Sequence, residues 1–224
     1  MSHIARIEVP GAFHLVEQRA RYDRHASMDF GDRQISLGML RDSLYRYGIG
    51  LCGYNILADR TLLVVIPAHS RTISLALLNA DRSFVRRFNQ IHNQVGPHWQ
   101  RTYNCCPFSD EVSRSVLRYV DIASVQERDA RPDDKFWLNS ADEHSGLLAR
   151  GLLTATLGRL PLPGPWHAWL ESPEDKTFVL AMEQCLRTGK PFGAFAFVRM
   201  VEQVCGRRTR PACLKWPGLF HSLR

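Results

Sequence analysis

Hydrophobic residues recur along this chain at two spacings, which together predict an α+β fold. In some segments apolar and polar residues alternate, as on a half-buried strand, and in others apolar residues return every three or four positions, as on one face of a helix. The predicted elements of the first half are a strand or short hairpin at 4–18, a helix at 32–47, strands at 50–57 and 61–66, a helix at 70–94, a strand at 98–106 and a helix at 109–122. This order predicts a ferredoxin-like core, a four-stranded antiparallel sheet with helices on one face.

The second half of the chain has helical spacing only. Its predicted helices are those at 146–158, 176–187 and 195–205. The last of them ends before Gly206, a residue type that is common at helix C-termini. Charged residues crowd into the segment that precedes these helices. We therefore predict three regions, namely an α+β domain at 1–125, a linker or exposed segment at 126–145 and a helical C-terminal region at 146–224.

Composition favours a globular protein with an anionic partner. The chain is 45% hydrophobic, and no apolar run reaches the roughly 18 residues that a membrane helix needs. The net charge is +7, and only four of the 29 Lys and Arg residues are Lys. Because arginine binds phosphate through two parallel hydrogen bonds, this excess favours nucleic acid, although an Arg-rich proteome would also produce it.

The N-terminus and the cysteines bear on where the protein works. No secretory signal is readable before Pro10, so we expect a cytoplasmic protein, associated with the nucleoid if it binds DNA. The six cysteines do not have the spacing of a zinc site, and we expect them to be reduced thiols.

Three segments, taken in order, resemble one protein family. The segment ARIEVPGAFH at 5–14 is similar to the first strand of the single-tyrosine HUH transposases. The segments RFNQIH at 87–92 and LRTGKPFG at 186–193 are similar to the long helix and the C-terminal helical segment of one branch, the REP-associated tyrosine transposases. The resemblance runs over most of the chain, and it implies the HUH transposase fold with DNA as the partner.

Members of that family cleave single-stranded DNA, and the resemblance implies which residues would do so. Two histidines in a His-x-His strand, with a polar residue from a nearby helix, hold magnesium or manganese, which polarises the scissile phosphate. A tyrosine on that helix attacks phosphorus and becomes covalently linked to the DNA. In this sequence the two histidine positions are Arg60 and Leu62, the nucleophile's position is Tyr119, and the Asn four residues further on is Ala123.

All three metal ligands of the family pattern are therefore missing. We expect no metal cofactor, and we interpret Tyr119 as a vestigial nucleophile position, with its ring packed on the helix. Arg60 could still clasp a phosphate, because a guanidinium forms charge-assisted hydrogen bonds with phosphate oxygens. It would not provide the coordination geometry of a metal. The sequence thus predicts a protein that binds DNA and does not cut it.

Basic residues accompanied by hydrogen-bonding and aromatic neighbours form the predicted DNA-binding surface. The candidate contact residues are Arg82, Arg86, Arg87, Asn89, Trp99, Arg101, Arg207, Arg208 and Arg210. We expect those between 82 and 101 to line one concave side of the sheet. The basic cluster at 207–210 is followed by an apolar stretch at 214–220, which favours packing or partner docking there. The expected partner is single-stranded or hairpin DNA, with no membrane, and two copies could form a homodimer.

Alternatives remain open at the level of the sequence. The chain could be an active, metal-dependent transposase or nicking enzyme that uses Tyr119, or a protein-interaction module that has lost DNA binding. His14, His92 and His98 could form a relocated metal site, although they lie on different predicted elements. Ser109 with Asp110, or Cys105 with Cys106, could suggest another nucleophile, but capping and core packing explain these residues better.

Overall fold

The structure, a computed structural model, describes residues 6–21, 28–130, 138–147, 151–153, 165–173, 175–206 and 208–209, with the backbone alone for 124–130. Its strands are β1 (Phe13–Arg19), β2 (Ile49–Ile56), β3 (Arg60–Pro67) and β4 (Asn104–Phe108). Its α-helices are α1 (Phe30–Arg46), α2 (Thr72–Ile91), α3 (Ser113–Ala130), α4 (Ala141–His144), α5 (Trp166–Glu171), α6 (Lys176–Thr188) and α7 (Phe195–Cys205).

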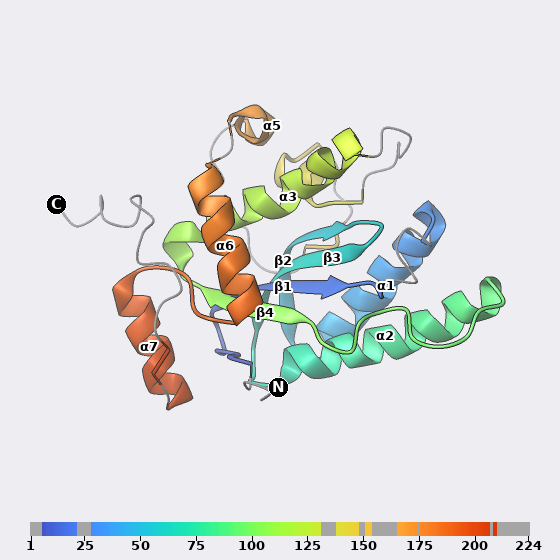
Figure 1. Ribbon diagram of the computed structural model, residues 1–224, viewed down its shortest axis with the longest axis horizontal. Helices are drawn as coiled ribbons and strands as arrows, with labels where there is room; N and C mark the ends of the chain where they lie inside the picture. Colours follow the sequence, from blue (N-terminus) through green and yellow to red (C-terminus); the bar gives the residue numbers. More distant parts are fainter. Residues whose placement is uncertain are drawn as a thin grey trace.

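The four strands form one antiparallel sheet in the order β2-β3-β1-β4. α1 connects β1 to β2, and α2 connects β3 to β4, so the predicted ferredoxin-like α+β fold is confirmed. Figure 1 shows these two helices side by side below the sheet. None of the helices in the described part of the chain is long and apolar enough to cross a membrane.

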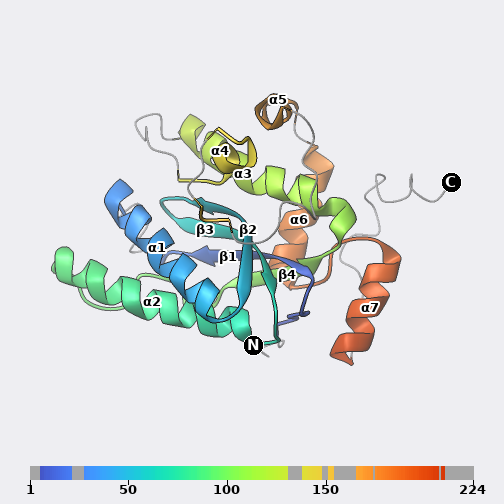
Figure 2. The same ribbon diagram turned by 180° about the vertical axis from the view of Figure 1, so that it is seen from behind.

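Both faces of the sheet are covered, because successive side chains of a strand point to opposite sides. On β3, Leu63 and Val65 belong to one buried cluster with α1 and α2, while Leu62 and Val64 belong to a second cluster with α3, α5 and α6. The sequence predicted helices on one face of the sheet, and α1 and α2 cover that face. In addition, α3 and the C-terminal helices close the other face, which Figure 2 shows from behind.

Local sequence explains where several helices begin and end. Asp29 and Asp32 form a reciprocal capping box at the start of α1. The Asp175 side chain accepts hydrogen bonds from two backbone N–H groups at the start of α6, and Gly189 ends that helix in the left-handed conformation. Gly206 ends α7 in the same conformation, as predicted.

The fourth strand is shorter than predicted. It covers Asn104–Phe108, whereas the expected strand began at 98, because His98 and Trp99 are buried beside the Phe84 ring on α2. Tertiary packing of aromatic residues thus replaces a regular ladder at this point. An isolated bridge pairs Trp99 with Ala20, the residue after β1, and backbone hydrogen bonds join Arg21 to His98 and Gln100 to Arg19.

The segment expected to be a linker or exposed is packed where the structure describes it. α3 continues to Ala130, and beyond the undescribed residues 131–137 the chain returns to pair with β2. Ser140 and His144 are buried, because their polar atoms find partners in the core. The prediction of an exposed segment is therefore wrong for residues 138–144.

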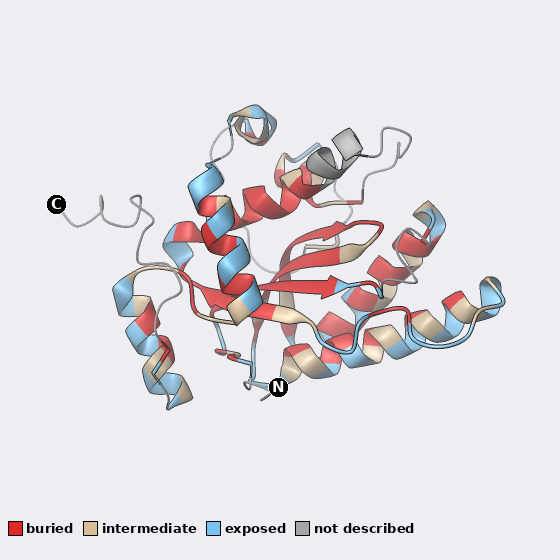
Figure 3. Ribbon diagram, in the orientation of Figure 1, coloured by how far each residue is buried: buried red, intermediate tan, exposed pale blue. Residues whose placement is uncertain are grey.

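α5 and α6 share the core of the sheet, whereas α7 packs in a separate small cluster with residues before β1. Trp166 of α5 and Met182 of α6 are buried in the same cluster as β1, β3 and α3. Figure 3 shows the buried inner side of α6 and the exposed outer sides of α6 and α7. The helix expected at 146–158 lies largely outside the described residues, and the described parts of it, 146–147 and 151–153, are not helical.

Candidate nucleic-acid interface

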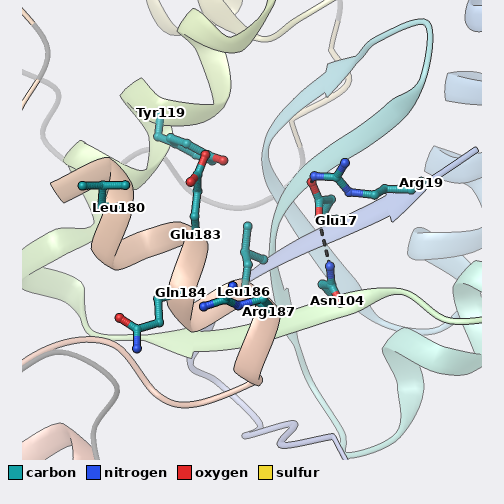
Figure 4. Close-up of a pocket in the computed structure, with 9 residues that line it drawn as sticks. All are labelled: Glu17, Arg19, Asn104, Tyr119, Leu180, Glu183, Gln184, Leu186 and Arg187. Carbon is teal, nitrogen blue, oxygen red and sulfur yellow. Dashed lines mark hydrogen bonds and ion pairs between the residues drawn. The ribbon is translucent and has the colours of Figure 1, made fainter. Parts of the chain in front are cut away.

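α3 carries the tyrosine that the sequence singled out, and it lies across one face of the sheet (Figure 1). Its inward residues Val116 and Val120 are buried in one cluster with Leu62 of β3. Tyr119 lies at the border of this cluster, with 8% of its surface exposed. The ring is therefore packed, as expected, while the hydroxyl points into the space between α6 and β1 (Figure 4).

The structure places all four positions of the family's catalytic pattern on one side of the sheet. Leu62, Tyr119 and Ala123 belong to the same buried cluster. Arg60 lies two residues before Leu62 on β3, so its side chain faces the same side. Its charge lowers the pKa of Tyr119.

The residues at these positions do not fit a divalent metal ion. Leu62 and Ala123 have no side-chain donor atom, and Arg60 is a cation that cannot act as a ligand. Within the described ranges, no three His, Cys, Asp or Glu side chains form a group that could hold a metal. No step of the function proposed below therefore involves a metal.

A pocket of about 580 Å³ opens beside Tyr119, and we call it the Tyr119 pocket. One wall comes from the strands β1 and β4, and the other from α6 (Figure 4). The lining residues are Glu17, Arg19, Asn104, Tyr119, Leu180, Glu183, Gln184, Leu186 and Arg187. Most of them are polar or charged, which suits a charged ligand better than an apolar one.

The strand wall of the Tyr119 pocket is a fixed polar network. Glu17 is paired in register with Asn104 on β4 and with Leu62 on β3. One carboxylate oxygen of Glu17 accepts a hydrogen bond from Arg19 at 2.7 Å, and the other accepts one from the Asn104 side chain at 2.9 Å. Glu17 thereby holds the Arg19 guanidinium at the rim of the pocket, where 45% of its side chain is exposed.

The environment of Tyr119 keeps its hydroxyl protonated. Burial raises the pKa of Tyr119 to about 12, while Arg60 lowers it and Glu183 raises it further. Glu17 and Arg19 act more weakly, in opposite directions. A protonated phenol can donate a hydrogen bond to an anion, but it is a poor nucleophile.

Sequence reasoning missed most of the residues that line the Tyr119 pocket. Glu17 and Arg19 lie at alternate positions of β1, on the face that also carries Leu15, and two charged residues on a core-facing side of a strand are a signal for a site. Glu183 and Arg187 lie four residues apart on α6, and no local pattern connects that helix to Tyr119.

The predicted contact residues on α2 lie elsewhere. Arg82, Arg86 and Arg87 are exposed on the outer side of that helix, which packs on the sheet face opposite to α3. The expectation that they line a concave side of the sheet is therefore wrong, since α2 itself covers that face. They form a second basic surface, separated from the Tyr119 pocket by the thickness of the sheet.

Two other candidates have structural roles. The Asn89 side chain donates a hydrogen bond to the carbonyl oxygen of Gly96 at 2.8 Å and so fixes the turn after α2. Trp99 is 6% exposed and packs against the rings of Phe84 and His98. A ring buried in this way offers no face on which a base could stack, so we remove Trp99 from the predicted surface.

The structure describes two of the four remaining basic candidates. Arg101 is exposed, and the preceding Gln100 donates a backbone hydrogen bond to Arg19 at 2.9 Å, which brings this segment to the end of β1 near the Tyr119 pocket. Arg208 is exposed just after α7. Arg207 and Arg210 lie outside the described residues.

The histidines and cysteines considered as alternative sites are held by the core. The buried His14 ring is bonded to backbone atoms, and burial lowers its pKa to about 4. His92 forms a hydrogen bond with the Asp32 carboxylate of α1, and His98 packs among aromatic rings. The three histidines therefore do not meet at one site. Cys105 and Cys106 are buried on opposite faces of the sheet, and Cys213 lies outside the described residues.

Comparison with known proteins identifies the fold. No protein-family model matches the sequence, and no curated protein matches it. The structure is similar to that of a REP-associated tyrosine transposase bound to a REP hairpin, with a TM-score of 0.51 and 15% identity over 70% of this chain and 92% of that chain. The protein described here therefore has the transposase-like HUH fold that the resemblance implied.

Two further structures are more distant. A protein from Deinococcus radiodurans assigned as a transposase has a TM-score of 0.38 and 15% identity over 53% of this chain and 95% of that chain. A bacterial tRNA(His) guanylyltransferase-like protein in complex with GTP has a TM-score of 0.41 and 10% identity over 58% of this chain and 73% of that chain.

Proposed function

We propose that this chain binds single-stranded or hairpin DNA at the Tyr119 pocket and does not cleave it. The observation that carries the proposal is a charged pocket next to Tyr119, on a fold whose related structure holds a REP hairpin, at a place where the metal ligands are replaced by Arg60, Leu62 and Ala123. A protein of this kind would act by occupying its DNA site, and it would be found with the nucleoid.

The binding part of the proposal is supported by the charges around the pocket. Arg19 and Arg187 line it, and Arg60 on β3 is the register partner of Arg19. Guanidinium groups from β1 and α6 therefore line one opening, and guanidinium is the side chain best suited to phosphate. The volume of about 580 Å³ leaves room for a nucleotide unit that is not paired in a duplex.

The absence of cleavage is supported by the state of the tyrosine. With a pKa of about 12, roughly one Tyr119 in 100,000 is a phenolate at pH 7. Arg60 could neutralise part of the charge on a phosphate, and such transition-state contacts are each worth about 3 kcal/mol. A single cation does not orient phosphorus for in-line attack in the way that three metal ligands do. We therefore expect no useful rate of DNA cleavage by Tyr119.

Binding is tested with a panel of fluorescent hairpin, single-stranded and duplex oligonucleotides, measured by anisotropy at several salt concentrations. We expect the hairpin and the single strand to bind more tightly than the duplex, with affinity that falls as salt rises. EDTA should leave the affinity unchanged. Equal or absent binding to all three would instead favour a protein-interaction module.

Cleavage is tested by incubating the protein with labelled hairpin and single-stranded DNA in magnesium or manganese and separating the products on a denaturing gel. We expect neither a covalent protein–DNA adduct nor a shortened strand. An adduct that forms with the wild type and disappears in Tyr119→Phe would show that the protein is an active nicking enzyme. The position of the Tyr119 hydroxyl at the pocket is the observation that favours this alternative.

A further inference from the structure

We propose that Arg60, Arg19 and the Tyr119 hydroxyl together bind one phosphate group of the nucleic acid. This inference rests on the proposed function, since it names the chemical group that the Tyr119 pocket takes. It concerns residues of three elements, β3, β1 and α3, that no local sequence pattern brings together.

The first observation is a pair of like charges on neighbouring strands. Arg19 of β1 and Arg60 of β3 are direct partners in the antiparallel register, and both side chains face α3. Like charges directly opposite one another destabilise a sheet. An anion bound between the two guanidinium groups would remove this repulsion, whereas an uncharged ligand would not.

The second observation is that the two arginines are unequally satisfied. Arg19 is paired with Glu17 at 2.7 Å, and Asp59 also acts on it electrostatically. The Nε–H of Arg60 is buried and has no hydrogen-bond partner among the described residues. A buried donor without a partner costs about 1–3 kcal/mol, and a phosphate oxygen is a strong acceptor for it.

The third observation is the neighbouring hydroxyl. Arg60 is the register partner of Arg19, and Arg19 lines the pocket together with Tyr119. The high pKa of Tyr119 keeps the hydroxyl protonated, and a protonated hydroxyl donates to a phosphate oxygen. In this arrangement the tyrosine holds a phosphate that it does not attack.

The nearby carboxylate of Glu183 should oppose the binding of an anion, so it provides a second test. Glu183 points from α6 toward Tyr119 in Figure 4, and its charge raises the pKa of the phenol, so a phosphate at the same place would meet a carboxylate. Arg187 lies one turn further along α6, on the same face of the helix. Removal of the Glu183 charge should therefore strengthen phosphate binding, opposite to the effect of removing Arg60.

The affinity test uses the full chain with a short single-stranded oligonucleotide. We expect Arg60→Gln to weaken binding about tenfold or more, which is the size of one charge-assisted contact, and to reduce the log-log salt slope by about 0.7. Glu183→Gln should bind several-fold more tightly. Arg46→Gln on α1, which removes the same charge from an exposed position on the opposite face of the sheet, is the matched control, and thermal melting of each variant checks that it is folded.

A direct readout separates this inference from the proposed function. The Nε–H resonance of Arg60, identified by its loss in Arg60→Gln, is followed by nitrogen–proton NMR while dimethyl phosphate or inorganic phosphate is added to the wild type. We expect that resonance to shift downfield, with a smaller change in Glu17-paired Arg19. A shift without any DNA binding would sink the proposed function and leave the phosphate site standing.

The converse results overturn the phosphate site itself. If DNA binds but the Arg60 resonance does not move with phosphate or with DNA, the arginine has no such contact. Equal DNA affinity of the wild type and Arg60→Gln, or weaker binding by Glu183→Gln, would overturn it as well, since neither result fits an anion between these groups.

Discussion

At the scale of single residues, a buried carboxylate on the inner side of α3 is held by three hydrogen bonds. Asp121 is buried and accepts hydrogen bonds from His144 at 2.7 Å, Trp166 at 2.9 Å and Ser140 at 2.6 Å. The other ring nitrogen of His144 is 2.8 Å from the carbonyl oxygen of Cys52. Because both partners of the imidazole only accept, both of its nitrogens carry hydrogen, and the ring is a cation paired with the carboxylate.

This ion pair predicts a stability that falls as pH rises. Burial lowers the pKa of His144, but the hydrogen bond and charge of Asp121 outweigh it, so the net pKa is raised above the ordinary value of 6.5. The contribution to stability is therefore complete below about pH 6.5, the unfolded pKa, and it is lost as pH rises through the folded pKa.

The measurement compares the wild type with His144→Gln. We expect the variant to lose about 3–5 kcal/mol of unfolding free energy at pH 6, because the Asp121 charge stays buried without its cation. Urea denaturation at pH 6 and at pH 9 should give a smaller difference at the higher pH. A difference that stays constant across this range would mean that His144 is neutral in the folded protein.

At the scale of elements, the two basic surfaces belong to different layers. α2 lies on one side of the sheet, and α3 and α6 lie on the other (Figure 1). The arginines of α2 are exposed, and the Tyr119 pocket is lined by residues of α3, α6, β1 and β4. A short oligonucleotide bound at the pocket cannot reach both surfaces. A longer hairpin could extend around the edge of the sheet, with α2 as a second contact.

The double substitution Arg86→Ala with Arg87→Ala tests this separation. We expect it to leave the affinity for a tetranucleotide unchanged. For a long hairpin it should weaken binding similarly for different sequences, and lower the log-log salt slope by about one unit for each lost contact.

The outcome is read from fluorescence anisotropy at several salt concentrations. If the tetranucleotide also loses affinity, the short DNA does not bind at the Tyr119 pocket. If neither DNA is affected, α2 takes no part in binding.

At the scale of the whole molecule, the C-terminal helices complete the face of the sheet that carries the site. Phe178, Met182 and Cys185 of α6 pack into the cluster that contains Leu15, Leu62 and the aliphatic residues of α3. The outer wall of the Tyr119 pocket also comes from α6. The Tyr119 pocket therefore depends on the packing of α6 against the sheet.

A pair of methionine substitutions measures this dependence. Met182→Ala should lower the unfolding free energy by about 2–5 kcal/mol, because the fully buried side chain leaves a cavity in the shared core. Met200→Ala on α7, where 36% of the residue is exposed, should cost less than about 1 kcal/mol. Both variants and the wild type should unfold in one transition by fluorescence and by circular dichroism. Two separate transitions would contradict a shared core.

Local patterns predicted the order of strands and helices along the chain and most helix positions. The alternation in β1, the apolar runs in β2 and β3 and the spacing in α2, α6 and α7 depend on neighbouring residues, so they can be read without knowledge of the fold. The resemblance added the positions of Arg60, Leu62, Tyr119 and Ala123, and the structure places these on one side of the sheet.

Only the tertiary structure decided what surrounds those positions. Glu17 and Asn104 meet Tyr119 through strand register, Glu183 and Arg187 reach the pocket from a helix far along the chain, and the His144 imidazole finds Asp121 across a segment that looks like a charged linker. Trp99 is of a residue type that stacks on bases, but its ring is buried. Local spacing sets which way a side chain points, but long-range pairing and packing decide what it points at.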